Sequence, residues 1–213
     1  MTQDSLFPPS VLEARGMAAL IPVHRVMVRC GKCAFAQSRT SVVLGEGNPH
    51  ADLMFIGEAP GRAEDLAGRP FLGHAGDLLT KMLLAMGLTR EMCYLTNVVA
   101  CRPPQGKSVE AAEVEACSAY LHQQIRAVQP KCIVTLGSTA ARTLTKTKKG
   151  VVDLRGHWYK YTCEGVQIPV RCTYHPAFLL RPAGVRCKGE VWRDLQHVLH
   201  LLGLTPLDVD HER

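Results

Sequence analysis

The sequence predicts an α/β protein, a three-layer α/β/α sandwich whose central, mostly parallel sheet has four strands. Short apolar runs of strand length alternate along the chain with longer segments of helical periodicity. Such an alternation is typical of parallel strands joined by crossover helices, which cover both faces of the sheet. The length of 213 residues suits one sizeable core and is too short for two comfortable domains.

The first half of the chain contains one leader helix, one strand and one long amphipathic helix. Residues 1–29 are expected to form a leader with a short helix at 10–20. The run DLMFI at 52–56 predicts a strand, because a Gly- and Pro-rich turn follows it. Apolar side chains at helical spacing over 75–86, followed by Gly87, indicate an amphipathic helix and its end.

Two further strands and two helices are expected in the middle of the chain. A second strand is predicted at about 93–99, and Ser108 is expected to cap a long helix that ends near Val128. The apolar run at 132–136 predicts the third strand, after which Ser138 is expected to cap another helix.

The last part of the chain predicts a hairpin and a terminal helix. Residues 158–163 and 166–173 are expected to pair across a Glu-Gly turn, and a helix is expected at about 190–202. These elements predict one domain over 30–203, with a C-terminal tail at 204–213.

The composition is that of an ordinary globular protein, with 46% hydrophobic and 21% charged residues. The N-terminus lacks a secretory pattern and no apolar stretch is long enough to span a bilayer. We therefore expect an intracellular, cytoplasmic monomer without a membrane partner. The net charge of +6 suits a polyanionic partner but does not identify one.

Four of the nine cysteines form a candidate metal site. Cys30 and Cys33 are a C-x2-C pair, Cys101 closes the second strand and Cys117 lies in the long helix. Four thiolates suit either a tetrahedral zinc or an iron–sulfur cluster, and their spacing leaves open that choice and an accidental pairing of core cysteines. Buried, inert thiols are expected at the others: Cys93, Cys132, Cys163, Cys172 and Cys187.

Three polar segments lie at or near the ends of predicted strands. They are the GEAPG turn at 57–61, Asn97 and His175. In open α/β sheets the ligand site lies beyond the carboxyl ends of the strands, so the topology gathers these segments at one edge.

Three blocks of this sequence resemble the family 4 uracil-DNA glycosylases, the iron–sulfur members of their superfamily. The blocks are GEAPGRAEDLAGRPFLGHAGDLL at 57–79, TNVVACRPP at 96–104 and TYHPAFLLR at 173–181, and the likeness runs from about 30 to 202. The resemblance implies an enzyme that flips uracil out of DNA and hydrolyses its N-glycosidic bond, leaving an abasic site. It also implies that the cysteines at 30, 33, 101 and 117 hold a 4Fe–4S cluster.

The resemblance assigns a role to individual side chains. The acid of the GEAPG turn falls on Glu58, and the second acid of that block falls on Glu64. The aromatic residue that stacks on the base is Phe71, the base-reading amide is Asn97, and the histidine of the HPA block is His175. An amide can pair with both edge groups of uracil, provided that a neighbouring hydrogen bond prevents it from flipping.

Further residues are expected to line the uracil pocket or to contact DNA. Ala59, where other families often carry a water-positioning acid, and Pro60 belong to the pocket. Arg181 is expected to contact the DNA backbone, with Leu179 and Leu180 as wedges that fill the vacated space.

One related mechanism is not expected. A subgroup with a GEQPG loop and a nucleophilic histidine captures uracil covalently, but here the segment 102–116 contains no histidine. Several alternatives remain open. A glycosylase for hypoxanthine or xanthine, a non-catalytic iron–sulfur DNA-binding module and a zinc-stapled nucleotide-binding domain are the other interpretations.

Overall fold

A computed structural model describes residues 15–206 and contains one six-stranded sheet in the order β1-β3-β2-β4-β6-β5. The central strands β3, β2, β4 and β6 are parallel, and the two edge strands are antiparallel to their neighbours. The strands are β1 (Glu46–Gly47), β2 (Leu53–Gly57), β3 (Tyr94–Asn97), β4 (Cys132–Leu136), β5 (Trp158–Cys163) and β6 (Val166–Thr173).

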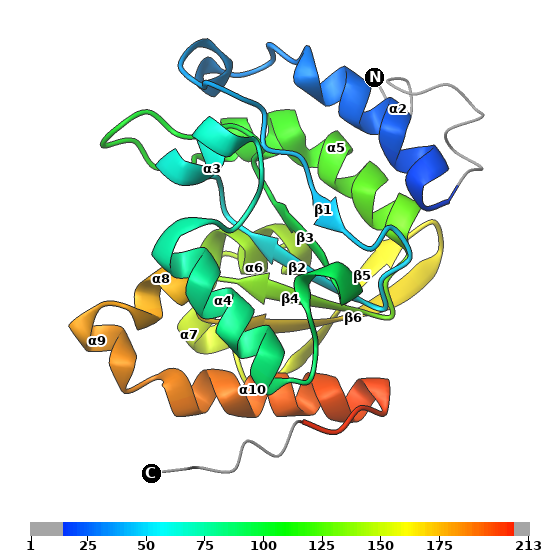
Figure 1. Cartoon of the computed structure of the whole chain (residues 1–213), viewed down its shortest axis with the longest axis vertical. Coiled ribbons are helices and arrows are strands. Elements are labelled where there is room, and N and C mark those ends of the chain that lie inside the picture. The colour runs from blue at the N-terminus through cyan, green and yellow to red at the C-terminus, as the bar shows by residue number, and fades with distance from the viewer. Residues whose placement is uncertain (1–14, 207–213) are drawn as a thin grey trace.

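Helices cover both faces of this sheet (Figure 1). The α-helices are α2 (Met17–Val28), α3 (Arg62–Ala67), α4 (Gly73–Ala85), α5 (Ala111–Val128), α6 (Ser138–Thr145), α7 (Val151–Leu154), α8 (Pro176–Leu179), α9 (Pro182–Val185) and α10 (Lys188–Leu202). Two short 3-10 helices, η2 (Ala34–Gln37) and η3 (Arg90–Met92), complete the described elements. None of the helices within residues 15–206 has the length and apolar character needed to cross a bilayer.

The predicted three-layer α/β class is confirmed, but the sheet has six strands rather than four. The four parallel strands form its centre, as expected. The prediction missed β1, because Glu46 and Gly47 have no apolar pattern and pair only through backbone groups with Leu95 and Tyr94. The predicted number of four also omitted the antiparallel edge strand β5, although its residues were expected to pair in the hairpin.

Two cores lie on opposite faces of the sheet. Along β2 the side chains alternate, so that Met54 and Ile56 join the core under α2 and α5, while Leu53 and Phe55 join the core under α4 and α10. All five residues of β2 are buried. A strand buried on both faces is typical of a parallel sheet between two helical layers.

The hairpin of β5 and β6 is confirmed at the predicted residues. Its turn residues Glu164 and Gly165 both have positive φ, at 49° and 76°. Two consecutive positive φ values match the tight turns whose twist suits a two-residue hairpin.

Two of the predicted helix caps are wrong. Helix α5 begins after Glu110 rather than after Ser108, because Glu110 and Glu113 form a reciprocal capping box, with Glu113 Oε2 accepting from the Glu110 N–H at 3.1 Å. Ser138 is the first residue of α6 rather than its cap, and the preceding Gly137 turns the chain with a φ of 90°.

The N-terminal helix differs most from its predicted position. Part of the range expected to be helical, 10–14, lies outside the described residues, while α2 continues through Pro22 to Val28. Leu20 and Val23 are buried in the core shared with α5. Helix α2 is therefore an integral part of the core that it shares with α5.

Candidate active site

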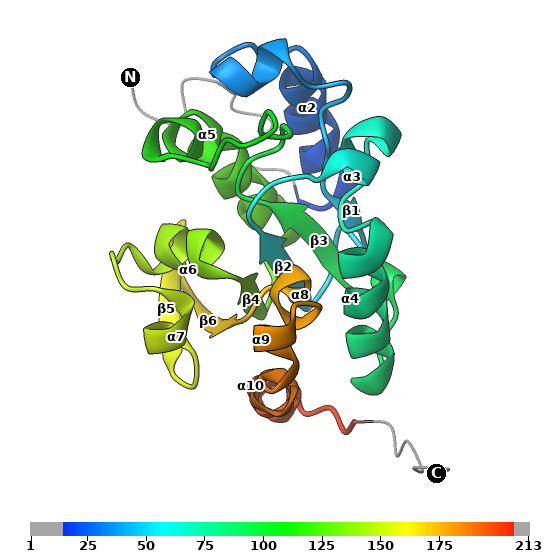
Figure 2. The ribbon, with the colours of Figure 1, turned by 90° about the vertical axis from the view of Figure 1, so that its left-hand side faces the viewer.

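A cavity of ≈ 440 Å³ opens at the carboxyl ends of β2, β3 and β6, and residues of α3, α4 and α8 line it. Figure 2 shows α3 and α4 to one side of α8. The parallel strands bring the sequence-predicted residues together here, because their carboxyl ends meet at one edge of the sheet. The residues that line the cavity include Glu58, Ala59, Pro60, Glu64, Phe71, Asn97 and His175.

Asn97 ends β3 directly beside Gly57, its register partner at the end of β2. A Cβ atom on Gly57 would lie 2.4 Å from Asn97 Oδ1 and 2.8 Å from Phe71 Cζ. Only glycine therefore lets the amide and the ring approach the strand this closely. Packing against Gly57 therefore restricts the Asn97 amide, and the neighbouring hydrogen bond expected to prevent its flipping stays a prediction.

Phe71 is buried and has a φ of 54°, a left-handed conformation that is costly for an aromatic residue. Its carbonyl oxygen accepts a hydrogen bond from Arg90 Nη1 at 3.0 Å, and it lies so close to Gly76 that a Cβ there would clash. The ring stacks near that of His175, with centroids 6.3 Å apart and planes 28° apart. Contacts from two segments thus fix the Phe71 backbone, and its ring lies at the cavity wall beside His175.

The two acids have different partners. Glu58 Oε2 accepts a hydrogen bond from Thr139 Oγ1 at 2.6 Å. Glu64 Oε1 accepts from the Leu72 backbone N–H at 2.9 Å and so ties α3 to the start of α4. The Glu64 carboxylate therefore helps to hold the loop that carries Phe71.

His175 caps α8, and its Nδ1 accepts a hydrogen bond from the Ala177 N–H at 3.1 Å. A neutral ring that accepts at Nδ1 carries its proton on Nε2. Burial lowers the pKa of His175 to about 4, so the ring is neutral at pH 7. The site therefore contains a neutral imidazole whose Nε2–H is a hydrogen-bond donor.

The predicted DNA-contacting residues lie beside the cavity and differ in exposure. Arg181 lines a neighbouring cavity of ≈ 420 Å³, which shares Glu58 and His175 with the first. Leu180 is 49% exposed, whereas Leu179 is 2% exposed and packs in the core under α4 and α10. The expectation that Leu179 is a wedge is therefore wrong, because adjacent helical residues point in different directions.

The four candidate cysteine ligands come from segments that pack together. Cys30 and Cys33 pack against the core that contains Cys101 and Cys117. Burial raises the pKa of the Cys101 thiol, a hydrogen bond from Arg39 opposes this, and the nearby Cys33 and Cys30 raise it further. Within the described residues no three His, Cys, Asp or Glu side chains are arranged to hold a single metal ion.

Arg39 holds two parts of this cysteine group. Its Nη1 donates to Cys101 Sγ at 3.2 Å, and its Nη2 donates to the Cys30 carbonyl oxygen at 2.7 Å. A guanidinium beside a sulfur ligand stabilises the thiolate form that metals bind. The donor set and its positive neighbour fit a thiolate-bound group that carries negative charge.

Two residues that support the site were missed from the sequence. Thr139 belongs to no recognisable sequence motif. Asp65 is buried and accepts from the Thr40 N–H at 2.9 Å, but in the sequence it resembles an ordinary helix-surface acid. Only contacts between distant segments identify them.

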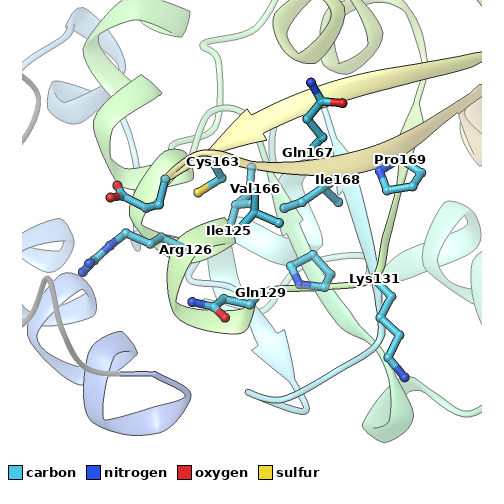
Figure 3. A pocket seen from close by; sticks show the side chains of 11 residues that line it. Ile125, Arg126, Gln129, Lys131, Cys163, Val166, Gln167, Ile168 and Pro169 are labelled. Atoms are coloured by element: carbon cyan, nitrogen blue, oxygen red, sulfur yellow. The ribbon is translucent and has the colours of Figure 1, made fainter.

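Another cavity, of ≈ 240 Å³, lies at the opposite end of the sheet (Figure 3). It is enclosed by the end of α5, the start of β4 and the β5–β6 hairpin, and Ile125, Val166 and Ile168 cluster in it. It contains none of the residues that the sequence singled out for the active site. The chemistry-bearing side chains gather at the carboxyl edge instead.

Comparison with known proteins agrees with this geometry. The model of the Uracil DNA glycosylase superfamily matches residues 44–196. The type-4 uracil-DNA glycosylase of Archaeoglobus fulgidus is 41% identical over 192 residues, which cover 88% of this chain and 95% of the relative. Those of Pyrobaculum aerophilum (41%, covering 81% and 89%) and Thermotoga maritima (39%, covering 79% and 86%) are similarly related. The chain therefore belongs to the uracil-DNA glycosylase superfamily and, within it, to the type-4 family.

Proposed function

We propose that this protein repairs DNA by excising uracil, and that the cavity at the carboxyl ends of β2, β3 and β6 receives the flipped nucleotide. The observation that carries the proposal is the convergence of Asn97, Phe71 and His175 on one cavity in a chain of this family. Extrusion is needed because the bond to be broken is hidden within the base stack.

The reaction breaks the bond between sugar C1′ and uracil N1. The bonding electrons leave with N1, so the base becomes anionic while the sugar becomes cationic at C1′. A water molecule adds its oxygen to C1′ and releases one proton, and the uracil anion takes up a proton. The enzyme must therefore stabilise opposite charges on the two fragments.

Asn97 and Phe71 recognise the base. The Asn97 amide nitrogen donates to uracil O4, and its Oδ1 accepts from N3–H, a pairing that cytosine cannot match. The face of Phe71 stacks on the base, which contributes ~1–3 kcal/mol. The contact of Gly57 with both side chains supports a fixed spacing between the amide and the ring.

His175 receives the charge that develops on the base. Its Nε2–H donates to uracil O2, because Nδ1 is occupied by the Ala177 N–H. A neutral donor is available over the physiological range, since burial keeps the pKa of the ring near 4. Loss of one such donor typically lowers the rate ~10²–10³-fold.

Glu58 acts on the sugar side of the reaction. It lines both neighbouring cavities, which supports a position where the base meets the rest of the nucleotide. Its carboxylate orients the attacking water or stabilises the cationic sugar. Glu64 is the second acid and crowds the C5 side of the base, where thymine carries a methyl group, while Ala59 and Pro60 complete the wall.

DNA contacts lie next to this junction. The exposed Leu180 inserts into the space that the flipped base leaves, and Arg181 binds the adjacent backbone phosphate. The exposure of Leu180 supports this assignment.

The Cys30, Cys33, Cys101 and Cys117 thiolates hold a 4Fe–4S cluster. When bound, the cluster supplies a structural link, because glycosidic hydrolysis moves no electrons. The ligands tie the segment after α2, the segment after β3 and helix α5 together.

Cys101→Ser should lower the iron content, the absorbance near ~400 nm and the melting temperature, whereas Cys187→Ser should leave all three unchanged. An unaltered melting curve in Cys101→Ser contradicts the structural role.

The direct test is incubation of the iron-loaded protein with a uracil-containing oligonucleotide, followed by alkali cleavage of abasic sites. Strand cleavage is expected with uracil, and Asn97→Ala should reduce both its rate and its preference for uracil over cytosine. Parallel substrates carrying hypoxanthine or xanthine test the alternative specificities. The proposal fails if the loaded protein leaves uracil in DNA intact.

A further inference from the structure

The loop between α6 and α7 carries an unusual concentration of positive charge. Lys146, Lys148 and Lys149 are exposed, and the side chain of Arg142 is exposed beside them. Among the ion pairs within residues 15–206, none involves these four side chains. We call residues 146–149 with Arg142 the basic loop.

Hydrogen bonds hold the basic loop in place. Arg142 Nε donates to the Lys149 carbonyl oxygen at 3.1 Å, and the Lys149 N–H donates to Thr147 Oγ1 at 3.3 Å. Just beyond the loop, the Val151 N–H donates to Ser138 Oγ at 3.1 Å. The chain is thereby brought back from the end of α6 to its beginning.

The basic loop borders the active site. Ser138 and Val151, which close it, line the cavity that also contains Glu58, His175 and Arg181. In Figure 2 the loop projects beside α6 and α7, on the side of the site opposite α3 and α4. The basic loop therefore lies along one flank of this second cavity.

We propose that the basic loop binds backbone phosphates of the DNA strand that flanks the flipped nucleotide. This inference rests on the proposed function and extends its DNA contacts beyond Arg181. DNA carries a dense row of phosphate charges, and cations without carboxylate partners gain most from neutralising them. Lysine ammonium groups suit this role because they act as mobile point charges that need no fixed geometry.

The test measures how binding depends on salt. The probe is a duplex with 2′-fluoro-2′-deoxyuridine, which resists cleavage because fluorine disfavours the cationic sugar, so binding is measured separately from excision. For the double variant Lys148→Gln/Lys149→Gln, the slope of log K against log[salt] should become shallower by about 0.9 for each phosphate that the loop no longer neutralises. The affinity should fall most at low salt, where phosphate neutralisation contributes most.

Lys131→Gln is the matched control, because this exposed lysine directly precedes β4, at the far end of the sheet, and pairs with Asp52. Its slope should equal that of the wild type. A wild-type slope in the double variant, or an equal change in Lys131→Gln, overturns the basic-loop inference. Absence of excision by the wild-type protein would instead overturn the proposed function.

A separate observation concerns Glu58. Thr139, the second residue of α6, donates its hydroxyl to Glu58 Oε2 at 2.6 Å but lines neither of the two cavities. Hydrogen bonds to a carboxylate are strong and directional, so this one sets the direction of the acid. The remaining oxygen, Oε1, is then available to the water or sugar.

We infer that Thr139 is a positioning residue that acts through Glu58. This inference also rests on the proposed function. Thr139→Val should slow single-turnover excision about 10- to 100-fold, the range expected for one hydrogen bond to a charged acceptor, with little change in DNA affinity. Thr139→Ser keeps the hydroxyl and should restore most of the rate.

Two comparisons separate positioning from a general structural effect. Thr143 lies one turn later in α6 and its hydroxyl donates to the Thr139 carbonyl oxygen, so Thr143→Val removes a hydroxyl from the same helix without touching Glu58. This control should keep the wild-type rate. In a double-mutant cycle, Thr139→Val should cost little once Glu58 is Gln. Additive losses, or a Thr139→Ser variant as slow as Thr139→Val, overturn the inference, while a wild-type protein without excision overturns it together with the proposed function.

Discussion

Three polar side chains of the active site each have one atom engaged by the protein. His175 Nδ1 accepts from Ala177, Glu58 Oε2 accepts from Thr139 and Glu64 Oε1 accepts from Leu72. The opposite nitrogen or oxygen of each group remains for the substrate or water. Groups that are oriented before the substrate arrives need not reorganise during the reaction, which is the main source of electrostatic catalysis.

The pH dependence of stability should report the burial of His175. Its pKa in the folded state, about 4, lies below the ordinary value of 6.5. Its contribution to stability is therefore complete above about pH 6.5 and is lost as the pH falls toward 4, by on the order of 2–3 kcal/mol. Urea unfolding at pH 7.5, 5.5 and 4.5 should show this loss in the wild type.

The His175→Gln variant isolates this contribution. Burial also lowers the pKa of His24, which therefore adds a loss of the same sign in both proteins. The wild type should lose more stability than His175→Gln on acidification. Equal losses in the two proteins would contradict a buried, neutral His175.

Gly57→Ala tests the close packing of the base-reading residues. The added methyl group would meet Asn97 Oδ1 and Phe71 Cζ, so excision should slow at least about 10-fold, as expected for a small displacement of positioned groups. Gly189→Ala is the control, since a Cβ there meets no atom within 4 Å. Single-turnover rates that match in the two variants would show that Gly57 does not set this spacing.

Among the helices and strands, α3 connects the cysteine segments to the base pocket. Asp65, 1% exposed, accepts hydrogen bonds from the Thr40 and Ser41 N–H groups at 2.9 and 3.3 Å. Arg102, next to Cys101, lies 3.8 Å from its other oxygen. The neighbouring Glu64 holds the start of α4. Helix α3 therefore links the segments near the cysteines, through Asp65, to the loop between α3 and α4, through Glu64.

Asp65→Ala should destabilise the protein by about 2–4 kcal/mol, because it leaves two backbone donors without their acceptor. Asp77 is exposed on α4, and Asp77→Ala should stay within about 0.5 kcal/mol of the wild type. Urea unfolding of both variants makes the comparison. Similar unfolding free energies in the two variants would show that Asp65 does not hold these segments together.

Over the protein as a whole, two cores on opposite faces clamp the sheet and place its carboxyl edge. One core unites α2, α5 and α6, and the other unites α4, α8 and α10. The N-terminal helix α2 completes the first core, and the segment that follows it carries Cys30 and Cys33. The stability of the active site therefore depends on helix α2, which lies near the N-terminus.

Leu20→Ala tests this dependence. Leu20 is 1% exposed, so its truncation should cost about 2–5 kcal/mol of unfolding free energy. The adjacent Ile21 is 43% exposed, and Ile21→Ala should cost far less. If both variants unfold at the wild-type urea concentration, α2 does not contribute to the core.

Local signals in the chain were sufficient to predict the α/β class, the four parallel strands, the hairpin and the residues that meet at the carboxyl edge. Apolar periodicity, turn residues and short motifs need no knowledge of distant contacts. Long-range contacts in the folded protein were needed to establish that β1 pairs through its backbone, that Leu179 faces the core and that Thr139 holds Glu58. Each of these depends on two segments far apart in the chain, and a hydrogen bond or a packing contact between such segments leaves no pattern in either one.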